Sequence, residues 1–127
     1  ARSVHLADGS ALGYEHLIVA TGATHSYFGR DDWATHAPGL KTLADAQGIR
    51  ARLLEAFERA ERSADAEDRA TLLRFVVIGG GPTGVEMAGT LAEIARHTLP
   101  GEFRGIDPSQ AEILLLEGGA RILAAYP

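Results

Sequence analysis

The pattern of apolar and polar residues near the N-terminus predicts a β-hairpin. Val4 and Leu6 alternate with less apolar neighbours, and Asp8-Gly9 follows as a strong tight-turn signal. Residues 10–14 can then return as the second arm. We therefore expect two short paired strands at the start of the chain.

Three continuous apolar runs farther along the chain predict buried strands. They lie at residues 17–20, 72–78 and 113–116, and each ends at or close to a glycine. Runs of this kind are typical of strands that are covered on both faces. The stretches 24–39 and 98–109 contain Pro and Gly and are expected to be irregular connections.

Helical periodicity predicts two helices. Thr42 is a candidate N-cap with Asp45 three residues later. Apolar residues then recur at steps of three or four on one helical face: Leu43, Ala46, Ile49, Leu53, Phe57 and Ala60. Residues 61–69 are charged and poor in apolar side chains, which predicts a linker or a frayed helix end. The second helix is expected from Val85 to about Arg96.

The order of strand, glycine turn, helix and strand over residues 72–117 is typical of the βαβ unit of a parallel sheet. The predicted fold class is therefore α/β, with a Rossmann-type dinucleotide-binding unit in a three-layer arrangement. Strands that are apolar on both faces need a neighbouring strand and a helix on either side.

The glycine turn at residues 79–84 has the pattern G-x-G-x-x-G, which gains weight from the strand before it and the helix after it. Gly79 permits a tight turn, Gly81 lets the backbone approach a pyrophosphate, and Gly84 allows close helix–strand packing. The helix N-terminus then directs free N–H groups at the phosphates, and Pro82 lies where a missing N–H costs nothing. The alternative is a turn that only packs.

Glu117 ends the last apolar strand, where a carboxylate can accept hydrogen bonds from the adenosine ribose. Its separation from Gly81 exceeds the usual spacing of about 20 residues, and the loop at 98–109 accounts for most of the excess. Such a carboxylate repels the 2′-phosphate of NADPH, which favours NADH. A solvated glutamate at a strand end is the alternative.

Glu86 lies in the first part of the second predicted helix. A carboxylate there is stabilised by the helix dipole by about 0.3–1 kcal/mol. Residue type and position alone therefore favour a structural role for Glu86.

Composition limits the remaining function classes. The chain has 127 residues, a formal charge of −5, 46% hydrophobic residues and no cysteine. These values suit one ordinary core and exclude a disulfide or a thiol nucleophile within the chain. No Lys/Arg cluster indicates nucleic-acid binding, and the five histidines lack metal-ligand spacing, so no metal site is expected. Because the chain lacks an initiator Met and ends soon after a strand, we expect a segment of a longer protein.

Residues 14–23, YEHLIVATGA, resemble the second flavin-binding signature of flavoproteins with two dinucleotide domains. The finer resemblance is to type II NADH dehydrogenases, the single-subunit NADH:quinone oxidoreductases. It rests on GATHSYFG at 22–29, APGLKTL at 37–43, GGGPTGVE at 79–86 and FRGIDP at 103–108.

This resemblance implies that hydride passes from NADH to FAD and that electrons continue to a quinone. It implies FAD contacts for Ala20, Thr21, Gly22 and Ala23. It implies NADH contacts for Gly79, Gly80, Gly81, Pro82, Thr83, Gly84, Val85 and Glu117. It also implies that Glu86 has a catalytic role near the stacked nicotinamide and flavin rings, through positioning or charge.

The same resemblance implies a domain organisation and a location. Residues 1–40 would end the first segment of an FAD domain, 41–70 would form a connecting helix and linker, and 71–127 would begin the NAD(H)-binding domain. The full-length protein would be membrane-peripheral, at the cytoplasmic face of the membrane.

Two other functions stay open from the sequence. One is a non-catalytic NAD-binding or interaction module, and the other is a related flavoprotein disulfide reductase. By itself the chain is expected to be inactive, to retain no FAD and to self-associate, because its apolar strands lack neighbours.

Overall fold

A computed structural model describes residues 2–126, so the predicted segment limits at residues 1 and 127 lie outside the described part. The chain begins with an antiparallel hairpin of β1 (Ser3–His5) and β2 (Ala11–Gly13). Asp8 Oδ1 accepts the Ser10 N–H at 2.9 Å, and Gly9 takes a φ of 85°. The predicted hairpin is therefore confirmed, and its turn forms where the Asp-Gly signal lies.

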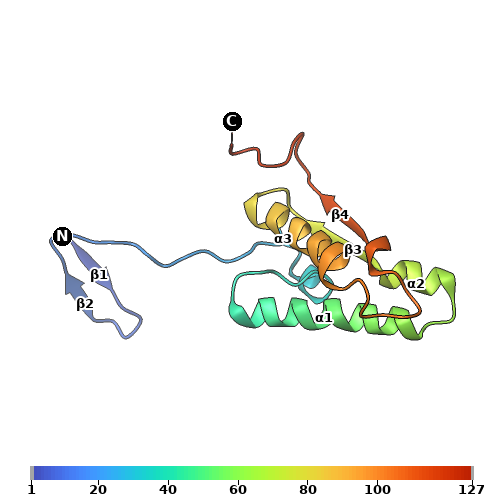
Figure 1. The fold of residues 1–127 in the computed structure, drawn as a ribbon. Helices are drawn as coiled ribbons and strands as arrows, with labels where there is room; N and C mark the ends of the chain where they lie inside the picture. Colours follow the sequence, from blue (N-terminus) through green and yellow to red (C-terminus); the bar gives the residue numbers. More distant parts are fainter. Residues whose placement is uncertain (1, 127) are drawn as a thin grey trace.

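The buried strand predicted at residues 17–20 is wrong. These residues form an extended, exposed connection that leads from the hairpin to the body of the molecule (Figure 1). Ile18 is 88% exposed and Val19 is 74% exposed. A strand needs a partner for its N–H and C=O groups, and within residues 2–126 no strand pairs with this run.

Residues 25–40 form a compact loop that contains the short 3₁₀ helix η1 (Asp31–Thr35). The Tyr27 hydroxyl donates to the Ala37 carbonyl oxygen at 2.7 Å. The His25 ring lies where a Cβ on Gly39 would stand. The predicted irregular, aromatic connection is therefore confirmed, and its ends are held together.

The first helix, α1 (Leu43–Arg62), begins with a full capping box. Asp45 N–H donates to Thr42 Oγ1 at 3.1 Å, and Asp45 Oδ2 accepts the Thr42 N–H at 2.8 Å. The helix α2 (Ala66–Leu72) follows, with Asp65 as its N-cap. The prediction of a linker through residue 69 is thus wrong in its second half, and the helix also takes the first residue of the predicted strand 72–78.

The βαβ unit is confirmed. Strand β3 (Arg74–Ile78) pairs in parallel with β4 (Glu112–Leu116), so that Val76 lies opposite Leu114. Between them run α3 (Pro82–Glu93), the π-helical turn η2 (Ile94–Thr98) and the 3₁₀ turn η3 (Pro108–Gln110). The helix begins at Pro82 rather than at Val85, because proline is well suited to the first helical position.

The core lies where α1, the end of α3 and the strands meet. Phe57 is fully buried, and its ring centroid lies 5.5 Å from that of Phe75 and 5.9 Å from that of Phe103. The Rossmann-type α/β class is confirmed, and residues 2–126 supply two strands of its parallel sheet. Val76 and Ile78 stay 51% and 65% exposed, so one face of β3 is open.

None of the helices in residues 2–126 is long and apolar enough to cross a membrane.

Candidate functional site

The glycine turn joins β3 to α3 in a conformation that needs its glycines. Gly79 has a φ of 107°, which side chains rarely tolerate. Its N–H donates to the Leu116 carbonyl oxygen at 2.8 Å and so extends the parallel ladder by one residue. A Cβ on Gly84 would overlap the carbonyl oxygen of Gly79. The helix therefore begins directly against the end of the strand, as the pattern predicts.

The N-terminus of α3 is open toward a ligand. Gly81 is the N-cap residue, and among the described residues no side chain caps this end. A Cβ on Gly81 would meet nothing within 4 Å, so the space beside the turn is free. The N–H groups of Thr83 and Gly84 belong to the first helical turn, where intrahelical partners are missing. This geometry fits a pyrophosphate.

Glu117 lies beside the same turn. Its Oε2 accepts the Gly80 N–H at 2.6 Å, and its Oε1 accepts the Gly119 N–H at 2.6 Å. These backbone N–H groups, with that of Gly119 first, hold the pKa of Glu117 below its usual value. The side chain is therefore ionised at neutral pH. A carboxylate offers about four acceptor positions, so lone pairs remain for two ribose hydroxyls.

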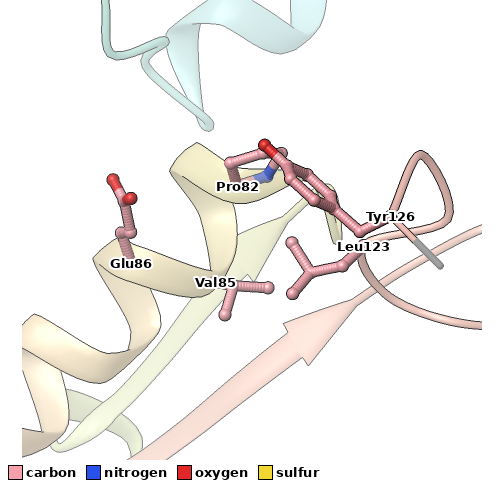
Figure 2. Close-up of a pocket in the computed structure, with 5 residues that line it drawn as sticks. All are labelled: Pro82, Val85, Glu86, Leu123 and Tyr126. Carbon is pink, nitrogen blue, oxygen red and sulfur yellow. The ribbon is translucent and has the colours of Figure 1, made fainter.

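Glu86 lies one turn into α3 and is exposed. It lines a hollow of about 210 Å³ together with Pro82, Val85, Leu123 and Tyr126. Figure 2 shows its carboxylate projecting from the helix, away from Leu123 and Tyr126. The structure thus brings Glu86, the glycine turn and Glu117 to one end of the βαβ unit.

The segment after Glu117 is a part of the site that the sequence patterns missed. The Leu123 N–H donates to the Gly80 carbonyl oxygen at 2.6 Å, and Leu123 takes a φ of 52°. Gly118-Gly119 signalled only the end of a strand, and the pattern of residues 120–126 gave no sign of a return to the turn.

The residues predicted for FAD lie apart from this site. Ala20, Thr21, Gly22 and Ala23 are exposed in the extended connection, and Gly22 has a φ of 74°. Figure 1 shows this connection leading away from β3 and α3. These four residues line neither the hollow beside Glu86 nor the larger groove along β3.

A larger groove of about 990 Å³ lies along β3. The loop of residues 25–40, the helix α1 and the glycine turn form its other walls. The open side chains of Val76 and Ile78 belong to it, so the groove follows the uncovered part of the sheet.

A parallel βαβ unit with a glycine turn, an open helix N-terminus and a strand-end carboxylate defines a dinucleotide-binding α/β protein. The family model for pyridine nucleotide-disulphide oxidoreductases matches residues 1–127, and the chain belongs to that family.

Individual relatives narrow the comparison. The chain is 56% identical over 110 residues to the type II NADH:quinone oxidoreductase Ndh of Mycobacterium tuberculosis, covering 87% of this chain and 24% of that protein. It is 35% identical over 117 residues to the external alternative NAD(P)H-ubiquinone oxidoreductase B2 of Arabidopsis thaliana, covering 91% and 20%. The chain thus spans about a quarter or less of the length of these relatives.

A solved structure agrees with the sequence relatives. The chain superposes on NDH2 from Plasmodium falciparum in complex with NADH with a TM-score of 0.76 and 26% identity, over 98% of this chain and 26% of that one. The predicted resemblance to type II NADH dehydrogenases is therefore confirmed. Because the relatives named above are quinone oxidoreductases, the comparison favours type II NADH dehydrogenases over disulfide reductases.

Proposed function

We propose that this chain is the NADH-facing segment of a type II NADH:quinone oxidoreductase. One observation carries the proposal: the uncapped start of α3 and the Glu117 carboxylate lie at the same end of the βαβ unit. The carboxylate is held there by the N–H groups of Gly80 and Gly119. A packing turn alone needs neither feature. The identity to the Mycobacterium tuberculosis oxidoreductase, at 56%, supports the same assignment.

The residues of the chain have distinct parts in this function. The N–H groups of the first turn of α3 bind the pyrophosphate, and the bare face of Gly81 lets it approach. Glu117 accepts the ribose hydroxyls and disfavours a 2′-phosphate, which makes NADH the preferred nucleotide. When bound, NADH would supply a hydride, and FAD would take it up and supply electrons to a quinone.

Glu86 is the catalytic candidate in this proposal. Its position in α3, on the exposed side of the glycine turn, leaves its carboxylate free to approach the nicotinamide–flavin stack. A carboxyl group there acts by positioning and by electrostatics, because it takes no part in hydride transfer itself.

The FAD contacts and the membrane location extend the proposal to the full-length protein. Ala20 to Ala23 offer a backbone edge for the flavin, and the remaining FAD contacts come from outside this segment. Because quinones are apolar molecules that dissolve in membranes, we propose that the full-length protein works as a peripheral enzyme at the cytoplasmic face of a membrane.

The isolated segment is proposed to self-associate. The run at residues 17–20 has no strand partner within the described residues, and there β3 and β4 pair only with each other, so each has one unpaired edge. The apolar side chains of Val76 and Ile78 on β3 are also exposed. An unpaired apolar edge is a template for pairing with a second chain.

Rapid mixing of the flavin-loaded full-length protein with NADH, under anaerobic conditions, tests the function. We expect NADH to bleach the flavin absorbance and a soluble quinone to restore it. Reoxidation by a small disulfide but not by quinone would indicate a disulfide reductase. Binding of NADH without bleaching would indicate a non-catalytic module. When variants of the glycine turn are compared in this assay, Gly89→Ala is the control. It lies on the same helix, and its new methyl group has open space around it.

A further inference from the structure

Gly80 lies at the centre of a small cluster of hydrogen bonds. Its N–H donates to Glu117 Oε2 at 2.6 Å, and its carbonyl oxygen accepts the Leu123 N–H at 2.6 Å. A Cβ on Gly80 would lie 2.9 Å from Ile122 Cγ2. Gly80 is therefore held by the carboxylate of Glu117 and by the segment that follows Glu117.

Arg121 closes that segment. Its Nη2 donates to the carbonyl oxygens of Ala124, at 3.2 Å, and Tyr126, at 2.8 Å. The Tyr126 N–H in turn donates to the Leu123 carbonyl oxygen at 2.9 Å. Leu123 keeps a φ of 52°, which a non-glycine residue adopts only where its surroundings determine it. The closed turn and the bond to Gly80 are the surroundings that do so.

We propose that Arg121 is a positioning residue for the dinucleotide site, an inference that rests on the proposed binding of NADH. By closing residues 121–126 it keeps the Leu123 N–H on the Gly80 carbonyl oxygen. The glycine turn is thereby fixed in the shape that receives the pyrophosphate and the ribose. The Nη2 group of Arg121 donates to backbone carbonyls, so the residue acts through Leu123 and not by contact with the nucleotide.

The chemistry of the side chain sets the choice of variants. A single nitrogen, Nη2, serves both carbonyl oxygens. A lysine ammonium carries three donors and can replace it. Methionine has a comparable stem without a donor, so Arg121→Met removes both hydrogen bonds and Arg121→Lys keeps them.

The experiment measures the binding of ADP-ribose to the full-length, flavin-loaded protein by titration calorimetry. We expect Arg121→Met to weaken ADP-ribose binding about tenfold and Arg121→Lys to stay within about twofold of the parent. Flavin content should not change in either variant. In the ligand-free protein, amide hydrogen exchange at Leu123 should be faster in Arg121→Met than in the parent or in Arg121→Lys.

Several results would overturn the assignment. Unchanged ADP-ribose affinity with faster exchange at Leu123 would mean that the segment does not shape the site. Weaker affinity with unchanged exchange would mean that Arg121 contacts the nucleotide directly. A loss in Arg121→Lys equal to that in Arg121→Met would exclude the two carbonyls as its partners. If Arg121→Met does not fold, Arg121→Leu, which also lacks a donor, gives the same two measurements.

Failure of the proposed NADH binding has a different signature. In that case the parent protein itself does not bind ADP-ribose, while exchange at Leu123 still separates the parent from Arg121→Met.

Discussion

Alanine in place of Gly84 would force α3 away from β3. The new Cβ would overlap the Gly79 carbonyl oxygen and lie 3.0 Å from its carbonyl carbon. Both are backbone atoms, so no change of rotamer relieves the overlap. Overpacking costs about 1–3 kcal/mol, and a rigid backbone contact places this case near the upper value. The better helix propensity of alanine offsets at most about 1 kcal/mol of this cost. The free energy of unfolding should therefore fall by about 2 kcal/mol.

Two other glycines of the same region are matched controls. Gly89 lies in the middle of α3 with nothing within 4 Å of its Cβ position, so Gly89→Ala should stabilise the protein by about 0.5–1 kcal/mol. Gly81 has equal space and a φ of −73°, so Gly81→Ala should leave stability unchanged. Its methyl group would project into the space for the pyrophosphate, and NADH affinity should fall.

Thermal unfolding of the full-length variants is the assay. A change of 1 kcal/mol shifts the Tm of a domain of 150–250 residues by about 2–4 °C, so Gly84→Ala should melt roughly 4–8 °C below the parent. Gly89→Ala should melt at or above it. A Gly84→Ala protein as stable as Gly89→Ala would refute the close contact between α3 and the end of β3.

Four further predictions concern the carboxylates and the open strand edge. Glu117→Gln should narrow the preference for NADH over NADPH in titration calorimetry, and equal affinities in the parent would refute the role of this charge. Glu86→Gln should lower turnover or alter quinone dependence at an unchanged Tm, whereas untouched activity would favour a helix-dipole role. The Glu61 carboxylate accepts the Arg104 and Gly105 N–H groups, with that of Arg104 first in holding its pKa below the usual 4.5. Its stabilisation of this loop should be complete above about pH 4.5 and lost as pH falls through the lowered pKa. Amide protection in the loop, measured against the intrinsic exchange rate at each pH, that is already lost well above pH 4.5 would contradict this. The isolated chain should scatter light as a colourless dimer or larger species, and a yellow monomer would be the contrary result.

The glycine turn could be predicted from sequence because its requirements are local. A left-handed residue at Gly79 and a missing side chain at Gly84 are needed wherever a helix starts directly after a strand. The capping box of Thr42 and Asp45 is equally local, since the four residues 42–45 contain all of its partners. Short motifs such as this turn and this cap contain the residues that determine their backbone conformation, so they can be recognised in the sequence.

The strand predicted at residues 17–20 failed for the opposite reason. An apolar run shows that a segment can be buried, but pairing depends on a second strand that the run does not specify. The helix α2 was missed because its seven residues are too few for a clear apolar period, and its stability rests on the Asp65 cap.

Two surface glutamates explain why the site itself could be predicted only in part. Glu61 holds the loop at Arg104 and Gly105 to the end of α1, and Glu117 holds the glycine turn to the end of β4. Each side chain joins to backbone N–H groups far away in sequence. The strand-end position of Glu117 predicted a ribose acceptor but not its bond to Gly80, and nothing in the pattern distinguishes Glu61 from the other charged residues. Both contacts lie outside the core around Phe57. The core can therefore stay folded while the site loses its shape, so binding and unfolding must be measured separately in every variant.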